Sequence, residues 1–399
     1  MRILVIPSWY PPDGGNFFRD SCEGLHQSGN DIFVLACEQR SLKKFSFISF
    51  IKNFVIKVHE ENGLKVIRTI SWKIPKVEQL NVIKWSWKNR KMANWFFKRY
   101  EKPDIIYVFS SIWAGWPASS ISKKHRIPLV ISEHRGRFVD NNPYAGKLIK
   151  NFYLSYLKAS FKVASRIITV STRLQPSIQR IAGIDKNKFI TIPNLVDTEF
   201  FTSINKSSSG NPFIFFSLGV LEFLKGMDVL LKAFGIYLEK NNPAAELWIG
   251  GDGALKNDLE ELARKLNIES NVKFLGVLNR IQVRNSLNQA DAFVLATRIE
   301  SFGVVFIEAM ASGLPVIGTR SGGPEEIIVP GTGIVTEIDN VDQFAEAMKD
   351  IVENIDKFDR KFIRNYAIEN FSKDHIAKKH IELFNEVILE YNNKKSSMS

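Results

Sequence analysis

Short apolar runs alternate with amphipathic stretches along most of this chain, and this alternation limits the possible fold more than any other feature. The runs have the length and composition of buried strands, and stretches such as 227–238 and 256–266 between them have helical periodicity. The pattern predicts parallel sheets wrapped by helices on both faces. The predicted strands are residues 2–6, 32–36, 105–108, 129–132, 166–170, 213–218, 246–249, 272–275, 292–295 and 316–318.

The length of the chain and one polar stretch predict two α/β domains. A chain of 399 residues is too long for one ordinary core. The stretch 202–212, rich in Ser, Asn, Gly and Pro, separates the two series of strands and is typical of a linker. Doubly wound domains place their ligand crevices at the carboxyl ends of their strands, so we expect the active site in a cleft between the domains.

Charge is distributed unevenly between the two halves. The net charge is +12, but residues 1–200 carry +17 and residues 201–399 carry −5. Seven of the eight tryptophans lie within the first 116 residues. The two halves are therefore expected to meet different partners.

Few cysteines and no long apolar segment indicate the compartment. Cys22 and Cys37 are the two cysteines, which excludes a disulfide scaffold and suits a reducing environment. The apolar start is too short for a signal peptide, and no run reaches the roughly 18 residues that a membrane span needs. We expect a cytoplasmic protein that lies peripherally on the inner face of the membrane.

Two glutamates, Glu300 and Glu308, flank a turn that predicts an anion site. An apolar run precedes Glu300, Gly303 marks the turn, and a helix-like run carries Glu308. The start of a helix presents free backbone N–H groups and the positive end of its dipole. Such a site can hold a diphosphate while the two carboxylates bind sugar hydroxyls on either side.

The same stretch resembles the donor-binding signature of retaining glycosyltransferases of family 4. Residues 300–316 read Glu-Ser-Phe-Gly, four further residues, then Glu-Ala-Met-Ala-Ser-Gly-Leu-Pro-Val. The resemblance implies the GT-B fold, with two Rossmann-like domains facing a central cleft. It also implies metal-independent, retaining transfer of a hexose-type sugar from a nucleotide diphosphate, without a cofactor. We expect a UDP-sugar rather than a GDP-sugar.

The resemblance also implies boundaries for the domains. An acceptor domain would span 1–203 and a nucleotide-sugar domain 204–372. A last helix, 373–399, would cross back to the first domain. Its predicted apolar stripe is Ile376, Ile381, Leu383, Phe384 and Val387.

Several residues of the second domain match family positions that contact the donor. Lys225 matches the lysine beside the diphosphate, but Val220 stands where the family has an arginine, so we expect weaker donor binding unless Arg298 substitutes. Glu308 would bind the ribose and Glu300 the transferred sugar. The other implied donor contacts are Phe302, Gly303, Val304, Gly251 and Gly323.

In the first domain, the resemblance implies roles for Gly15 and His134. Gly15 belongs to a glycine loop that would face the donor, and His134 follows a strand and would meet the reacting sugar. The family's upstream His-x-His element is absent, because Tyr107 and Phe109 occupy its place. We therefore expect the chemistry at the acceptor to differ from that of the family.

A basic, tryptophan-rich segment, 72–100, predicts a membrane-surface contact. Eight Lys or Arg and one acid lie between Lys73 and Arg99. Indoles and cationic side chains favour an anionic lipid interface. An ordinary amphipathic helix with a solvated basic face is the alternative. Nucleic acid is not expected, because none of its binding motifs is present.

The sequence does not identify the acceptor. The basic first half favours a lipid-linked or cell-surface glycan. Two rival functions share the fold. One is a nucleotide-sugar epimerase, and the other is a non-catalytic membrane-surface protein on a degenerate transferase fold.

Overall fold

The computed structural model describes residues 1–12, 14–41, 56–145, 149–202, 212–240 and 244–397. They form two compact units. The first unit comprises Met1–Arg135, Ile149–Pro193 and Lys373–Ser399, and the second comprises Gly136–Leu148 and Asn194–Ser372. None of the helices in these ranges is long and apolar enough to cross a membrane.

The first unit is built on an eight-stranded sheet with the order β3-β4-β2-β1-β5-β6-β7-β8. All neighbours pair in parallel except β3 and β4, which form an antiparallel edge. The strands are β1 (Arg2–Pro7), β2 (Asp31–Ser41), β3 (Lys57–Glu61), β4 (Leu64–Lys73), β5 (Ile105–Phe109), β6 (Leu129–Glu133), β7 (Arg166–Thr169) and β8 (Phe189–Thr191).

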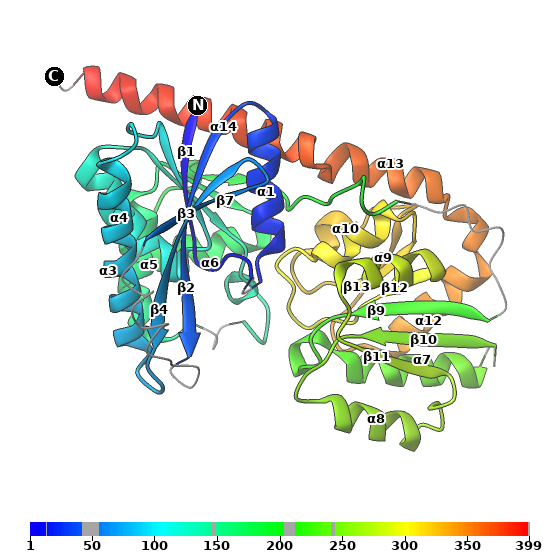
Figure 1. Cartoon of the computed structure of the whole chain (residues 1–399). Helices are drawn as coiled ribbons and strands as arrows, with labels where there is room; N and C mark the ends of the chain where they lie inside the picture. The colour runs from blue at the N-terminus through cyan, green and yellow to red at the C-terminus, as the bar shows by residue number, and fades with distance from the viewer. Residues whose placement is uncertain (13, 42–55, 146–148, 203–211, 241–243, 398–399) are drawn as a thin grey trace. The chain divides into compact units, whose positions relative to one another are not determined.

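Helices cover both faces of this sheet, with α3 and α4 on one side and α1 on the other (Figure 1). Because both faces are covered, central strands such as β1 are continuously apolar and buried. α4 and α5 pack side by side, and the rings of Trp116 and Tyr156 stack at 4.4 Å. The helices are α1 (Asn16–Gln27), α3 (Glu78–Phe97), α4 (Ser111–His125), α5 (Asn151–Val163), α6 (Gln175–Ala182) and α14 (Lys373–Ser396).

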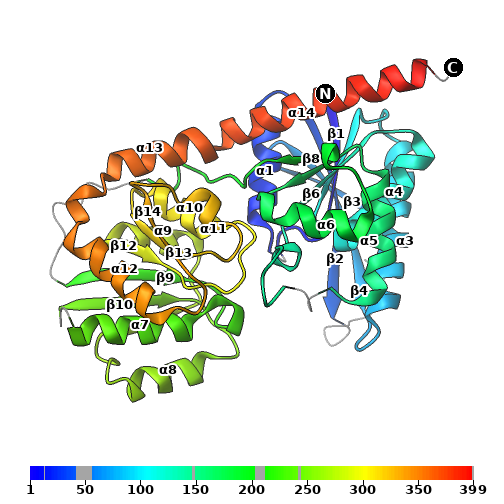
Figure 2. The ribbon, with the colours of Figure 1, turned by 180° about the vertical axis from the view of Figure 1, so that it is seen from behind.

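The second unit has a six-stranded parallel sheet with the order β11-β10-β9-β12-β13-β14. In Figure 2, α7, α8 and α12 lie on one face and α9, α10 and α13 on the other. The strands are β9 (Phe213–Leu218), β10 (Ala245–Gly250), β11 (Val272–Gly276), β12 (Ala292–Val294), β13 (Val316–Thr319) and β14 (Gly333–Thr336). The helices are α7 (Met227–Lys240), α8 (Lys256–Lys265), α9 (Arg280–Gln289), α10 (Val304–Ala311), α11 (Pro324–Ile327), α12 (Val341–Glu353) and α13 (Arg360–Phe371).

The predicted fold class, two doubly wound α/β units, is confirmed, and all ten predicted strands are present. Four strands were not predicted: β3, β4, β8 and β14. β3 is an exposed edge strand with the sequence Lys-Val-His-Glu-Glu, and β8 and β14 have three and four residues. These three strands are short or polar, whereas β4 has ten mostly buried residues in which polar side chains interrupt the apolar ones, so none of the four has the continuous apolar run on which the prediction depended.

The unit boundaries differ from those expected from the linker. Residues 203–211 of the predicted linker lie outside the described residues. The chain joins the second unit already at Asn194, because the Val196 amide donates to the Phe371 carbonyl at 2.8 Å and Arg364 donates to the Thr198 carbonyl at 2.9 Å. The stretch 136–148 between β6 and α5 also belongs to the second unit, which no sequence signal indicated.

The last helix, α14, belongs to the first unit and is anchored there by a buried hydrogen bond. The Tyr107 hydroxyl lies 2.8 Å from His380 Nε2, and both side chains are buried. Ile376, Leu383, Phe384 and Val387 of the predicted stripe are buried, whereas Ile381 is half-buried. His380 takes the buried position instead, because its ring finds a partner in Tyr107.

We expect the stability of the first unit to fall in mild acid. Burial lowers the pKa of His380 from 6.5 to about 4. The unfolded chain therefore binds a proton at higher pH than the folded chain, and stability is lost as the pH falls from 6.5 towards 4. The loss is about 3 kcal/mol. Urea unfolding at a series of pH values measures it.

His380→Gln is expected to remove this part of the pH dependence while keeping a hydrogen-bonding partner for Tyr107. His59→Gln, at an exposed histidine of β3, is the matched control and should unfold like the parent protein. An unchanged pH profile in His380→Gln would show that another group carries the acid sensitivity.

Candidate functional site

The strand order of the second unit reverses between β9 and β12, and the predicted donor residues follow these two strands. In a doubly wound sheet, the loops on either side of such a reversal leave a crevice at the carboxyl ends of the strands. Lys225 follows β9 and Glu300 follows β12. The fold therefore brings together two side chains that are 75 residues apart in sequence.

Three loops meet at this point through backbone hydrogen bonds. The Arg298 amide donates to the Leu224 carbonyl at 2.8 Å, which joins the loops after β12 and β9. The Glu300 amide donates to the Ser321 carbonyl at 3.2 Å, and the Gly323 amide donates to the Glu300 carbonyl at 2.7 Å. Glu300 is thus held on both sides by backbone contacts, so its side chain projects from a fixed position.

Lys225 and Glu300 form an ion pair, with 2.8 Å between Nζ and Oε2. The side chains are 24% and 14% exposed. Burial favours the neutral amine, but the Glu300 carboxylate outweighs it and holds the pKa of Lys225 above its ordinary value. Lys225 therefore stays protonated at neutral pH and can compensate negative charge.

Helix α10 starts next to this pair. Gly303 precedes it with φ 94°, a left-handed conformation that favours glycine. Phe302 is buried, Val304 is the first helical residue, and Glu308 lies half-buried one turn further along. The first amides of a helix have no acceptor within the helix, so this end of α10 could hold an anion, while the Phe302 amide just before it donates to Glu300 Oε1 at 3.4 Å.

Arg298 lies at the same loop, but other groups of the protein bind its guanidinium. Nη1 and Nη2 donate to the two carboxylate oxygens of Asp228 at 2.9 Å each, and Nε donates to Asp339 at 2.7 Å. Nη1 also donates to the Phe223 carbonyl at 2.6 Å. Only 6% of the Arg298 side chain is exposed, and its hydrogen bonds hold together the parts of the chain to which it donates. This geometry does not favour it as a substitute for the arginine replaced by Val220, whose side chain is 54% exposed.

Two predicted glycines are required by close backbone approach. A Cβ at Gly251 would lie 1.9 Å from the Gly219 carbonyl oxygen, and one at Gly323 would lie 2.2 Å from Phe302 Cα. The close contacts are with the protein's own loops. Gly251 and Gly323 therefore allow close packing between these loops.

Residues 136–145 come from the first half of the sequence but contact these loops of the second unit. Asn142 Nδ2 donates to the Arg298 carbonyl at 2.7 Å and to the Ser321 carbonyl at 3.3 Å. The Tyr144 hydroxyl donates to Asp339 at 2.5 Å. Both contacts reinforce the loop that carries Glu300.

In the first unit, the predicted His134 follows β6 and is packed among three phenylalanines. Its ring centroid lies 5.0 Å from that of Phe18, 5.5 Å from that of Phe17 and 5.8 Å from that of Phe109. Nε2 lies 2.9 Å from the Ser132 hydroxyl. The half-buried ring is thus held in one orientation.

Gly15 precedes α1 with φ 82°, and a Cβ there would lie 3.0 Å from Trp9 Cδ1. Substitution would disturb the indole of Trp9. Gly15 and Trp9 both lie on the loop between β1 and α1, at the point where the strand order of the first sheet reverses.

Glu133, next to His134, holds several neighbouring groups in place by hydrogen bonds, a role that the sequence did not predict. Its fully buried carboxylate accepts from the amides of Ser111, His134 and Arg135 at 2.9–3.1 Å, and from the hydroxyls of Ser110 and Ser111. Because Ser111 starts α4, the charge also lies at the positive end of that helix. Glu133 thereby fixes the backbone of His134.

Tyr107 and Phe109, the departures from the family's His-x-His element, have packing roles. Tyr107 anchors α14, as described above. Phe109 stacks on Phe18 with 4.4 Å between ring centroids and borders His134. Phe109 therefore contributes apolar packing beside His134.

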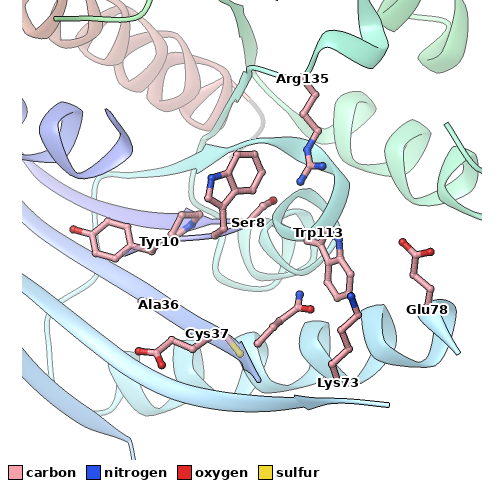
Figure 3. Close-up of a pocket in the computed structure, with 12 residues that line it drawn as sticks. Ser8, Tyr10, Ala36, Cys37, Lys73, Glu78, Trp113 and Arg135 are labelled. Atoms are coloured by element: carbon pink, nitrogen blue, oxygen red, sulfur yellow. The ribbon is translucent and has the colours of Figure 1, made fainter. Parts of the chain in front are cut away.

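A cavity of about 330 Å³ opens at the carboxyl ends of β1, β2 and β4, wholly within the first unit. Figure 3 shows Lys73 and Arg135 extending towards Trp113 from opposite sides. Burial raises the pKa of Cys37 in its wall to about 12, so that thiol stays protonated. The sequence did not predict this cavity. Its lining is Pro7, Ser8, Trp9, Tyr10, Ala36, Cys37, Glu38, Gln39, Lys73, Glu78, Trp113 and Arg135.

Two family models match the chain, one for each half. "Glycosyltransferase Family 4" matches residues 14–200, and "Glycosyl transferases group 1" matches residues 199–369. The chain belongs to glycosyltransferase family 4. In the part of this family 4 protein that the structure describes, no group of three or more His, Cys, Asp or Glu side chains is arranged to hold a metal ion.

Individual relatives agree with this family. A GDP-mannose-dependent monoacylated alpha-(1-6)-phosphatidylinositol monomannoside mannosyltransferase of Corynebacterium glutamicum is 36% identical over 33% of this chain and 35% of its own length. Other curated relatives are matched over 52–61% of their length. The putative teichuronic acid biosynthesis glycosyltransferase TuaC of Bacillus subtilis is 26% identical over 87% of this chain and 88% of its own.

The fold of the family 4 protein also resembles that of solved structures. Sucrose-phosphate synthase from Thermosynechococcus elongatus superimposes with a TM-score of 0.78 at 18% identity, over 98% of this chain and all of that one. At this identity the similarity concerns the fold alone.

We expect Gly323→Ala to weaken the second unit. The new Cβ would overlap the Phe302 backbone, so the loop that carries Glu300 must move, at a cost of several kcal/mol. Thermal unfolding measures the effect. Gly235→Ala, in α7, is the control: its nearest neighbour would be 3.8 Å away, and alanine favours the helix, so stability should be unchanged or higher. Equal melting temperatures for both variants would contradict the close approach.

Proposed function

We propose that this protein transfers a sugar from a nucleotide diphosphate to an acceptor hydroxyl and retains the anomeric configuration. One observation carries the proposal. In a family 4 chain, Lys225, Glu300 and the start of α10 converge at the strand reversal of the second unit. A cation, free helix amides and a carboxylate are the groups that an activated sugar requires.

The residues of the second unit have distinct roles in this proposal. Lys225 and the amides at Phe302, Gly303 and Val304 stabilise the departing diphosphate. Glu308 binds the ribose, and Glu300 binds the transferred sugar. Arg298, Gly251 and Gly323 hold the loops in place.

The reaction needs no covalent nucleophile from the protein. The acceptor oxygen forms the new bond to the anomeric carbon, while the bond from that carbon to the diphosphate oxygen breaks. The hydroxyl proton passes to the leaving phosphate oxygen on the same face. His134 of the first unit, oriented by Ser132 and the phenylalanines, would contact the transferred sugar.

The acceptor and the base of the donor remain predictions: a lipid-linked or cell-surface glycan and a UDP-sugar. An epimerase would convert the donor sugar without any acceptor, whereas a transferase gives a stable product only when the acceptor is added. A non-catalytic protein would give neither product. Family membership favours the transferase.

Lys225→Ala and Glu308→Ala are expected to weaken binding of UDP. Loss of a charge-assisted contact costs about 1.5–3 kcal/mol, which is about tenfold or more in affinity. Isothermal calorimetry with UDP, and with GDP in parallel, measures both variants and the preference for the base.

Exposed residues of the second unit provide controls. Lys357→Ala and Glu369→Ala change the same charges at surface positions and should bind UDP like the parent protein. If the parent protein binds neither nucleotide, or if all four variants bind equally, the donor site lies elsewhere.

We propose in addition that the first unit lies on an anionic membrane surface through the start of α3 and the residues before it. Fewer tryptophans are exposed on this surface than the sequence predicted. Trp72 and Trp85 are core residues, 6% and 0% exposed, because they fill space between α3 and the sheet. Lys84 and Lys88 donate to the carbonyls of Trp72 and Ile70 and so point inward.

The remaining surface still combines apolar and basic groups. Leu80, Ile83 and Trp87 are 57%, 41% and 53% exposed, and their spacing places them on one face of α3. Lys76 and Lys91 are exposed, and the Lys91 ammonium lies 3.7 Å from the Trp87 ring centroid. Such a face suits the boundary between headgroups and acyl chains.

The double variant Lys76→Glu/Lys91→Glu should lose most of its binding to vesicles that contain phosphatidylglycerol. Each basic residue near an anionic surface contributes about 1 kcal/mol, so two reversals should lower binding by more than tenfold. Co-sedimentation measures it. Lys378→Glu/Lys379→Glu makes the same charge change on exposed positions of α14 and should bind like the parent protein. Equal losses in both would indicate only a net-charge effect.

A further inference from the structure

The cavity of the first unit continues into a second, more open depression. That depression has a volume of about 670 Å³ and shares Lys73 and Glu78 with the cavity. Its other walls combine lysines with apolar groups, among them Lys76, Lys150, Ile74, Val77, Leu80 and Phe152. A ligand in the cavity could therefore extend past Lys73 into the depression.

The charges along this path favour an anion. Glu38 accepts from Arg40 at 3.0 Å and from Arg68 at 3.1 Å, so two cations outside the cavity already compensate it. Glu78 accepts from Lys150 and from the Tyr153 hydroxyl. Although burial favours its protonated form, these bonds hold the pKa of Glu78 below its ordinary value.

The two cations that line the cavity, Lys73 and Arg135, have contacts different from those of its two carboxylates. Lys73 makes no ion pair with the residues that the structure describes, although its charge also acts on the Glu78 carboxylate, and its ammonium extends into the cavity (Figure 3). Arg135 donates from Nε to the Ser110 hydroxyl at 2.7 Å, and its guanidinium lies 4.5 Å from the Trp9 ring centroid. Both positive groups border the same space, beside the indoles of Trp9 and Trp113.

Apolar side chains border the outer end of the path. Ile74 and Val77 are 39% and 36% exposed, and Leu80 next to them is 57% exposed. They continue the exposed face of α3 that ends at Trp87. The order along the surface is therefore an aromatic cavity, then Lys73, then an apolar strip.

We infer that this path binds an amphiphilic acceptor in which a phosphate joins a sugar to a long alkyl chain. The sugar lies in the cavity against Trp9 and Trp113, the phosphate lies at Lys73, and the chain leaves along Ile74, Val77 and Leu80. Aromatic faces suit the apolar faces of sugar rings, and an ammonium suits a phosphate as a point charge. The inference rests on the proposed function and narrows its acceptor to a lipid-linked sugar phosphate.

Three small probes separate the parts of such an acceptor: dodecyl phosphate, dodecyl glucoside and glucose 1-phosphate, each used below its micelle concentration with the full chain. We expect measurable binding of all three by calorimetry, with dodecyl phosphate tightest. Lys73→Met should weaken dodecyl phosphate and glucose 1-phosphate about tenfold and leave dodecyl glucoside unchanged. Leu80→Gln should weaken the two dodecyl probes and leave glucose 1-phosphate unchanged.

Matched controls are Lys57→Met on β3 and Leu389→Gln on α14, both at exposed positions of the same unit. Both should bind every probe like the parent protein. The inference is overturned if dodecyl glucoside binds as tightly as dodecyl phosphate, if glucose 1-phosphate does, or if the controls lose as much as the test variants.

Calorimetry with UDP on the same samples separates this inference from the proposed function. A parent protein that binds UDP but does not prefer dodecyl phosphate contradicts the acceptor path alone. A parent protein that prefers dodecyl phosphate but binds no nucleotide contradicts the donor site alone.

Discussion

The ion pair between Lys225 and Glu300 depends on backbone contacts between loops that are far apart in sequence. Loops at the carboxyl ends of β9, β12 and β13 satisfy one another's amides and carbonyls. Backbone can approach this closely only where a residue has no side chain. A Cβ on Gly323 would lie 2.2 Å from the Phe302 Cα. The charged groups of the site are therefore positioned by uncharged backbone, and Gly323, outside the motif 300–316, is part of what positions Glu300.

Buried charge in both units serves to position neighbouring groups. Glu133 in the first unit accepts five hydrogen bonds at the start of α4, and Arg298 in the second unit makes three bonds to carboxylates and one to a carbonyl. A buried charge that lost these partners would be costly, so each network strongly favours a single arrangement. Each also lies directly beside a proposed functional residue, His134 or Glu300. Rigid support of this kind is what a site needs to hold its reacting groups in place.

The fold and the donor motif could be predicted because both depend on local patterns. Ten buried strands have apolar runs, and residues 300–316 keep their order and spacing in the sequence. Contacts between distant residues could not be predicted in this way. Nothing in the sequence around Asn142 indicates that it binds the Arg298 carbonyl, and Glu133 resembles any strand-end carboxylate. Trp72 and Trp85 show the same limit, because composition alone does not separate a core indole from a surface one.

The departure at Val220 has a consequence for how the donor would be held. Its side chain points to solvent, and Arg298, the other candidate, is bound by Asp228 and Asp339. Lys225 then supplies the side-chain cation at the strand reversal, and it is already paired with Glu300. A diphosphate would have to share that ammonium with Glu300, which is less costly if the carboxylate turns to the sugar as the phosphates arrive. Under the proposed function, charge compensation and sugar recognition are therefore coupled through one ion pair, and the amides of α10 must carry a larger part of the diphosphate charge than they would beside an arginine.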